Sequence, residues 1–138
     1  MSRKAILFIP GFFGDRDESA DLFTDFVPIL HSQGFQTSRY DPSGLGESQE
    51  SLGDIDTWLE DSYLALQGLI ERGVRDIAIL GFSLGATFAV LNYANNLNLR
   101  RHIKALALWA PAFDPRTDML RRYKSNGEYA LAARGELL

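Results

Sequence analysis

The chain has 138 residues, of which 46% are hydrophobic, and its formal net charge is −4. This length suits one domain with one buried core. The acidic balance, without any basic cluster, excludes an electrostatic surface for nucleic acid or for an anionic membrane. The absence of cysteine excludes disulfide bonds and thiolate metal ligands. We therefore expect a single domain over residues 1–138 that binds a small molecule and uses no cofactor or metal.

The first residues have some features of a signal peptide, because the basic start at 1–4 precedes a short apolar run. However, an acidic stretch at 15–18 follows the run, where a cleavage site would need small residues. No other segment has enough consecutive apolar residues to span a bilayer. These observations predict a cytoplasmic protein without a membrane span.

Short apolar runs alternate with longer amphipathic segments, which is typical of a parallel α/β fold. The uninterrupted run at 4–9 is expected for a strand that helices cover on both faces, whereas 35–40 is less apolar and closer to an edge. The sequence predicts a three-layer α/β/α domain with a mostly parallel four-stranded sheet. The expected elements are strands at 4–9, 35–40, 76–80 and 104–109, helices at 19–33, 54–73 and 84–96, and one or two short helices at 115–138.

Two of these helices carry recognisable end signals. Gly34 suits the C-terminal cap of the first helix, and Pro28 inside that helix predicts a kink or a break. Asp54 and Gly73 suit the two ends of the second helix. The inward-facing residues expected in the first helix are Leu22, Phe26, Ile29 and Leu30. Those expected in the second are Ile55, Trp58, Leu59, Leu66, Leu69 and Ile70.

A Gly-x-Ser-x-Gly pentad at 81–85 separates the strand at 76–80 from the helix that follows it. A sharp turn between strand and helix holds its central residue in a strained conformation, and flanking glycines remove side chains that would collide. The Ser83 hydroxyl would then stand at a helix N-terminus, where N–H groups stabilise developing negative charge. The pentad alone occurs often by chance. Its position between strand and helix favours a catalytic serine.

Other loops leave the same edge of the sheet, where parallel strands end and ligands bind. The loop at 10–15 has two interpretations: the N–H of Phe12 pairs with that of Leu84 in an oxyanion hole, or the loop is only a tight turn. The glycine-rich loop at 40–48 fits a turn held by Asp41 and Ser43 better than a direct catalytic role.

Taken in order, these motifs resemble the α/β-hydrolase family, particularly its small esterases, acylglycerol lipases and thioesterase-like members. The resemblance implies that Ser83 attacks an ester, thioester or amide carbonyl while the N–H groups of Phe12 and Leu84 bind the oxyanion. Pro10 stands where many members have histidine. The matching segments are the nucleophile elbow at 81–85, the oxyanion loop at 11–12, the loop at 41–48, and the strand end at 110–112 that precedes a lid.

The sequence departs from the family pattern in its acid and base. Histidines of the family come late in the chain, but only His31 and His102 exist here, and both are expected at the edge of the sheet away from Ser83. Asp114 either substitutes for the acid or only caps a loop or helix. The chain thus resembles the first half to two-thirds of a hydrolase, incomplete at its C-terminus, with 115–138 as the start of a lid.

The sequence has two alternative interpretations besides a serine hydrolase. A non-catalytic ligand-binding or interaction protein derived from the same fold would also lack a base. Nucleotide binding is disfavoured because Ser83 and Gln49 stand where glycines of a Gly-x-Gly-x-x-Gly motif are needed.

The apolar strand at 104–109 predicts a homo-oligomer or a partner chain at that edge. The aromatic residues near the predicted site, which favour an apolar acyl substrate, are Phe12, Phe13, Phe82 and Trp109.

Overall fold

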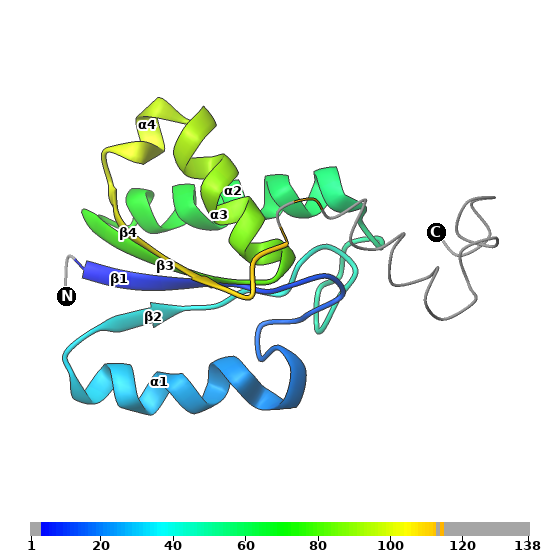
Figure 1. Ribbon diagram of the computed structural model, residues 1–138, viewed down its shortest axis with the longest axis horizontal. Helices are drawn as coiled ribbons and strands as arrows, with labels where there is room; N and C mark the ends of the chain where they lie inside the picture. The colour runs from blue at the N-terminus through cyan, green and yellow to red at the C-terminus, as the bar shows by residue number, and fades with distance from the viewer. Residues whose placement is uncertain (1–3, 113, 115–138) are drawn as a thin grey trace.

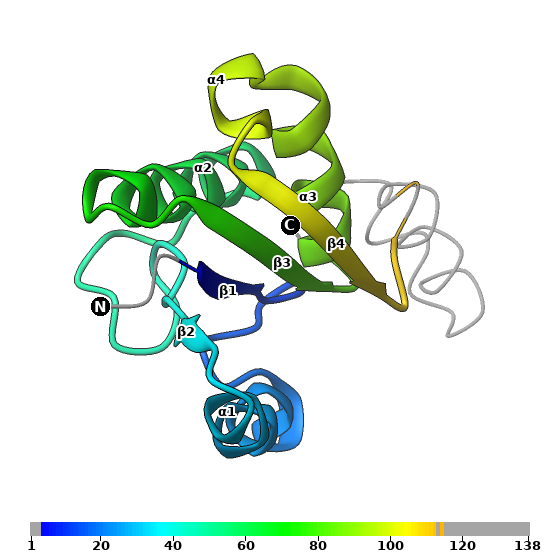
Figure 2. The ribbon, with the colours of Figure 1, turned by 90° about the vertical axis from the view of Figure 1, so that its left-hand side faces the viewer.

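The computed structural model describes residues 4–112 and residue 114. The strands are β1 (Lys4–Ile9), β2 (Gln36–Ser38), β3 (Asp76–Phe82) and β4 (Ile103–Trp109). The helices are η1 (Ser19–Asp21), α1 (Leu22–Ser32), α2 (Ile55–Glu71), α3 (Leu84–Asn95) and α4 (Leu97–Arg100). The strands form one parallel sheet in the order β2-β1-β3-β4. α1 covers one face of the sheet, while α2 and α3 cover the other (Figures 1 and 2). The predicted three-layer α/β/α fold is confirmed.

The register of the sheet brings the ends of three strands together. β1 pairs with β3 up to Ile9 beside Gly81, and β3 pairs with β4 up to Phe82 beside Trp109. Because all pairings are parallel, the loops that follow β1, β3 and β4 leave the same end of the sheet. We call this the C-terminal end of the sheet, and the opposite one its N-terminal end.

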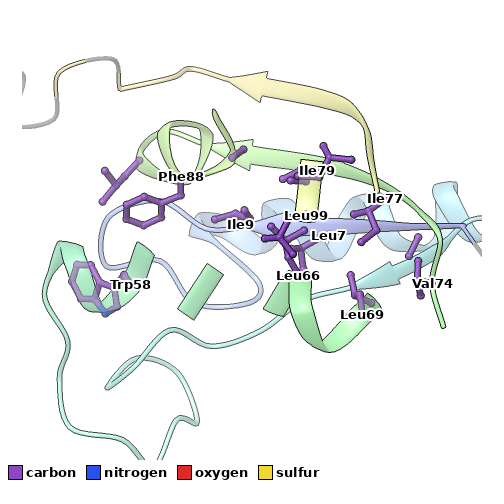
Figure 3. Close-up of a cluster of buried hydrophobic side chains, with 14 residues drawn as sticks. Leu7, Ile9, Trp58, Leu66, Leu69, Val74, Ile77, Ile79, Phe88 and Leu99 are labelled. Atoms are coloured by element: carbon purple, nitrogen blue, oxygen red, sulfur yellow. The ribbon is translucent and has the colours of Figure 1, made fainter. Parts of the chain in front are cut away.

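The main core lies between the sheet and the helices α2 and α3, as Figure 3 shows. The strands contribute aliphatic side chains to it, and the helices contribute leucines and two aromatic rings. Fully burying a side chain of this size stabilises the fold by about 1.5–3 kcal/mol. The main contributors are Leu7, Ile9, Ile77 and Ile79 from the sheet, and Trp58, Leu66, Leu69 and Phe88 from the helices. On the other face, Phe8 packs against Phe23 of α1, with ring centroids 5.0 Å apart.

The predicted ends of α2 are confirmed. The Asp54 carboxylate accepts the N–H of Thr57 at 2.8 Å, and Gly73 follows the helix with a φ of 90°. Of the residues predicted to face inward from α2, one prediction is wrong: Ile55 is 37% exposed. It stands at the first position of the helix, and the first buried residue of α2 is Trp58, three positions later.

The prediction for α1 needs two corrections. The helix runs unbroken through Pro28, which is on the exposed side, where water can bind the carbonyl that proline leaves without a donor. The inward-facing residue is Phe23, which is fully buried, whereas Ile29 is 59% exposed. The other three residues predicted to face inward, Leu22, Phe26 and Leu30, are half-buried, and Phe23 lies on the same face as Phe26 and Leu30 because it precedes them by three and seven positions.

The two sheet edges are β2 and β4. The edge position predicted for the strand at 35–40 is confirmed, although β2 is shorter than predicted. β4 has exposed residues along most of its length, including Leu108 and Trp109, which are 38% and 40% exposed. The short helix α4 was not predicted, and the helices predicted at 115–138 lie outside the described residues. Among the described helices, none combines the length and the apolar character needed to cross a membrane.

Candidate active site

Ser83 occupies the sharp turn between β3 and α3. Its φ of 53° and ψ of −116° lie in a region that non-glycine residues seldom adopt. A Cβ atom on Gly81 would lie 2.5 Å from the carbonyl oxygen of Gly85, and one on Gly85 would lie 2.1 Å from that of Ile9. Both neighbours are backbone atoms, so neither contact can be relieved by moving a side chain. The pentad therefore needs its glycines in order to bring α3 against the ends of β1 and β3.

The loop after β1 packs directly against this turn. A Cβ atom on Gly11 would lie 3.2 Å from the Cβ atom of Ser83. The N–H of Gly14 donates to the carbonyl of Gly11 at 3.0 Å and closes a four-residue turn. Phe12 is the second residue of that turn, a position whose N–H the turn does not use. Leu84 is the first residue of α3, where an N–H has no acceptor within the helix.

The chain that follows β4 holds the backbone of Ser83 on its other side. The N–H of Ser83 donates to the carbonyl of Trp109 at 2.9 Å, and its carbonyl accepts the N–H of Ala112 at 3.2 Å. The hydroxyl of Thr87 in α3 donates to the carbonyl of Ala112. Asp114 comes two positions later and is exposed at the same end of the sheet. These bonds fix both polar backbone groups of Ser83.

The two histidines lie toward the N-terminal end of the sheet. The Nδ1 atom of His102 is 3.1 Å from the carbonyl oxygen of Arg75, and the carbonyl of His102 accepts the N–H of Ile77 at 2.8 Å. Ile77 precedes Ser83 by six positions along the strand, which corresponds to about 20 Å. The Nε2 atom of His31 is 3.0 Å from the hydroxyl of Thr37, a residue of the middle of β2. Neither imidazole is therefore brought to Ser83.

Asp41 ties the loop after β2 to the loop after β1. Its side chain is only 8% exposed and accepts the N–H of Arg16 at 2.9 Å and that of Glu47 at 3.0 Å. The guanidinium of Arg16 pairs with the carboxylate of Glu47 as well. These contacts support the interpretation of this loop as a turn held by Asp41.

Ser43, the second residue expected to hold that turn, is bound by α2. Asp61 accepts the N–H of Ser43 at 2.7 Å and its hydroxyl at 3.0 Å, while the indole N–H of Trp58 donates to the Ser43 carbonyl at 3.0 Å. Desolvation raises the pKa of the neighbouring Tyr40, and the charge of Asp61 raises it further. The sequence did not indicate Asp61, since nothing in its spacing distinguishes it from the exposed carboxylates of α2.

Glu18 is the second residue near the site that the sequence did not single out. It belongs to an acidic stretch that suggests a solvated loop, yet it is only 8% exposed. Its carboxylate accepts the N–H of Gly11 at 2.6 Å, one residue before Phe12. A buried carboxylate in contact with this loop was visible only in the folded chain.

Two groups of aromatic rings lie beside the turn at Ser83. Within each group the rings meet edge to face, at centroid distances between 4.6 and 6.0 Å. A Cβ atom on Gly11 would lie 3.3 Å from the Phe82 ring, so the second group reaches the same loop. The first group consists of Phe12, Phe13 and Trp58, and the second of Phe26, Phe82 and Trp109. Among the described residues, no cluster of three or more carboxylates or histidines could hold a metal ion.

Comparison with known proteins identifies relatives of this arrangement. The sequence profile of the family described as serine aminopeptidase S33 matches residues 2–135. No protein with a curated description matches the sequence significantly. Among solved structures, mouse alpha/beta hydrolase domain-containing protein 10 is 19% identical, with a TM-score of 0.70 over 95% of this chain and 50% of its own. A lipase-esterase related protein from Clostridium acetobutylicum is 15% identical, with a TM-score of 0.66 over 95% of this chain and 54% of its own.

A third structure, an extracellular alpha/beta-hydrolase from a Paenibacillus species, is 13% identical, with a TM-score of 0.58 over 78% of this chain and 40% of its own. Identities this low show a common fold, which is the α/β-hydrolase fold. The chain spans about half the length of the solved structures that it matches.

Proposed function

Because the chain belongs to the serine aminopeptidase S33 family of α/β-hydrolases, we propose that it is a serine hydrolase whose nucleophile is Ser83. The hydroxyl oxygen of Ser83 attacks the carbonyl carbon of an ester or thioester and loses its proton to a general base, which later protonates the leaving group. The N–H groups of Phe12 and Leu84 stabilise the oxyanion. Collapse of this tetrahedral intermediate expels the alcohol or thiol and leaves an acyl-enzyme, which water then hydrolyses. The positive φ of Ser83 at a strand-to-helix turn is the observation that carries this proposal.

The placement of the histidines favours esters and thioesters over amides. An amine leaves a tetrahedral intermediate only after it is protonated, which is the task of the histidine in a serine hydrolase. Alkoxides and thiolates are better leaving groups and depend less on an acid. Since neither His31 nor His102 is near Ser83, the residues of this chain by themselves favour an ester or thioester over the peptide amide that the family's description suggests.

The aromatic rings beside Ser83 favour an apolar acyl group. Phe13 is 55% exposed and packs against Trp58, with centroids 5.3 Å apart, while Trp109 on the other side is 40% exposed. Exposed rings at a site are suited to bury a chain of methylene groups, each of which contributes about 0.8 kcal/mol. We therefore propose a small-molecule acyl substrate with an apolar chain.

The general base must come from outside the two histidines of this chain, and we propose that it is supplied by a segment or partner that pairs with the exposed edge of β4. That edge leads directly to Ser83, because Trp109 at its end accepts the Ser83 N–H. Asp114 is our candidate for the acid. Sedimentation of the isolated chain tests whether the edge of β4 pairs with a second copy. A strict monomer at high concentration would contradict self-association at that edge.

A fluorophosphonate probe tests the nucleophile directly, because it phosphonylates activated serines. We expect the probe to label the wild-type chain at Ser83 slowly and to do so faster when imidazole is added as an external base. Ser83→Ala should abolish the labelling. Ser51→Ala, which changes an exposed serine, is the matched control and should label like the wild type. Failure of imidazole to accelerate labelling at Ser83 would contradict the proposed function.

A non-catalytic ligand-binding protein with this fold is the second candidate. The hydrogen bonds that hold both histidines away from Ser83 favour it. It predicts that Ser83 stays unlabelled with or without imidazole, while the chain still binds an apolar acyl compound, as measured by quenching of tryptophan fluorescence. The probe and the binding measurement together separate the two candidates.

A further inference from the structure

Glu18 is a buried carboxylate in the loop between β1 and α1. It is only 8% exposed, and burying a charge this way is costly unless the oxygens find donors. One oxygen accepts the N–H of Gly11 at 2.6 Å. The other accepts the N–H and the hydroxyl of Ser19 at 3.1 and 3.3 Å. The carboxylate therefore joins the start of the loop after β1 to the start of η1.

The backbone of the loop is shaped around this carboxylate. Glu18 has a φ of 61° and a ψ of 178°, a strained combination that is almost confined to glycine. A Cβ atom on Gly14 would lie 2.4 Å from the bonded Glu18 oxygen, so only glycine leaves room for it. The strain at Glu18 and the glycine at position 14 both serve to place one side chain against Gly11.

The bond to Glu18 completes the fixation of Gly11. The carbonyl of Gly11 accepts the N–H of Gly14 at 3.0 Å, so both polar backbone groups of Gly11 have a defined direction. Because the peptide is planar and trans, the N–H of Phe12 points away from that carbonyl. Gly11 also packs against Ser83, with 3.2 Å between a Cβ placed on Gly11 and the Cβ atom of Ser83. The bond from Gly14 therefore sets the direction of the Phe12 N–H, and the contact with Glu18 holds the preceding peptide of the same loop, which packs against Ser83.

We propose that Glu18 is a positioning residue that holds the Phe12 N–H toward the oxygen of the carbonyl attacked by Ser83. This inference rests on the proposed function. Glu18 touches no reacting atom and acts only through Gly11. Loss of an oxyanion donor lowers kcat by about 100–1,000-fold. A donor that is present but points in the wrong direction should lower the rate of reaction at Ser83 less, by about 10–100-fold.

Three variants and one control test this role. Glu18→Ala removes the acceptor, whereas Glu18→Gln keeps a carbonyl oxygen of similar reach. Gly14→Ala places a methyl group where the carboxylate lies, and the carboxylate can move aside because it is the end of a flexible side chain. Glu71→Ala changes an exposed glutamate at the end of α2 and serves as the matched control.

The first measurement is the rate of fluorophosphonate labelling at Ser83 in the presence of imidazole. We expect Glu18→Ala and Gly14→Ala to label about 10–100-fold more slowly than the wild type. Glu18→Gln should recover most of the rate, and Glu71→Ala should match the wild type. Labelling by Gly14→Ala at the wild-type rate would overturn the proposal even if Glu18→Ala did not fold.

The second measurement does not depend on reactivity. We expect a nuclear Overhauser effect between the amide proton of Phe12 and the β protons of Ser83 in the wild type and in Glu18→Gln. It should be lost in Gly14→Ala and Glu18→Ala while the other amide signals stay in place. If the wild type fails to label, the proposed function fails, and this measurement still decides the positioning role. An unchanged Overhauser effect in Gly14→Ala would show that Glu18 has only a structural role.

Discussion

The chain turns sharply at both ends of the sheet, but the residues that adopt positive φ values differ between the two ends. At the N-terminal end, α1 and α2 are followed by Gly34 and Gly73, whose φ values are 83° and 90° and whose missing side chains would meet nothing within 4 Å. At the C-terminal end, Gly44 and Gly46 also have positive φ values, but residues other than glycine adopt them as well. The described residues of this kind are Phe13, Glu18, Ala20, Asp21, Ser83 and Ala110. The difference teaches that backbone strain is concentrated where the candidate active site lies.

The glycines of the two ends should therefore respond differently to substitution. Gly85→Val places a branched side chain against the backbone of Ile9 and should destabilise the fold by more than about 4 kcal/mol, or prevent folding altogether. Gly34→Ala adds a methyl group in open space and should cost only the strain of its positive φ, about 1–2 kcal/mol. Urea unfolding of both variants measures the difference. Equal losses would show that the elbow is not tightly packed.

The two histidines sharpen the comparison, because both lie toward the N-terminal end of the sheet. His102→Gln should lower the free energy of unfolding by about 1–2 kcal/mol, since the buried ring bonds the Arg75 carbonyl. His31→Gln should change it by less than about 0.5 kcal/mol, because His31 is exposed. Both variants should label at Ser83 within about threefold of the wild type, far from the orders of magnitude lost with a catalytic base. A hundredfold lower labelling rate in either variant would place that histidine at Ser83. It would contradict the position of both histidines toward the N-terminal end of the sheet.

The same comparison explains what the sequence could and could not predict. Apolar runs and the glycine pentad are local signals, so the strand at 4–9 and the turn at Ser83 were predicted correctly. Phe23 was missed because the pattern places the start of the helix at residue 19, whereas a strained loop at Glu18 leads into η1 and α1 begins only at Leu22. The contact between Glu18 and Gly11 joins residues across that same loop. Local sequence patterns do not encode such strained returns of the chain.

Relieving the strain at Ser83 should stabilise the fold. Ser83→Gly and Ser83→Ala both remove the nucleophile, but only glycine is at ease at a φ of 53°. We expect the glycine variant to be more stable than the alanine variant by about 1–2 kcal/mol in urea unfolding. Ala94→Gly, at an exposed position of α3, provides the control and should have the opposite sign, a loss of about 1 kcal/mol. An alanine variant as stable as the glycine variant would remove the evidence for strain at the nucleophile.

The smallest expected effect concerns pH and the cap of α2. The N–H and the hydroxyl of Thr57 donate to the Asp54 carboxylate at 2.8 and 2.7 Å, and these bonds lower the pKa of Asp54. Because the pKa of the folded state is lower than that of the unfolded state, the cap contributes stability at pH values above the ordinary aspartate pKa of about 4. That contribution is lost as the pH falls through the lowered pKa. The wild type should therefore exceed Asp54→Ala in stability at neutral pH, and the difference should shrink in acid.

Urea unfolding of the wild type and Asp54→Ala between neutral and acidic pH measures this change. Asp56→Ala is the matched control, because it removes the same charge from the first turn of α2 but leaves the bonds to Thr57 intact. Its difference from the wild type should be smaller at neutral pH, since the helix dipole alone acts on an exposed charge there. If the two variants were equally destabilised, the charge and not the cap would account for the pH dependence. The lowered pKa of Asp54 would then have no bearing on where α2 begins.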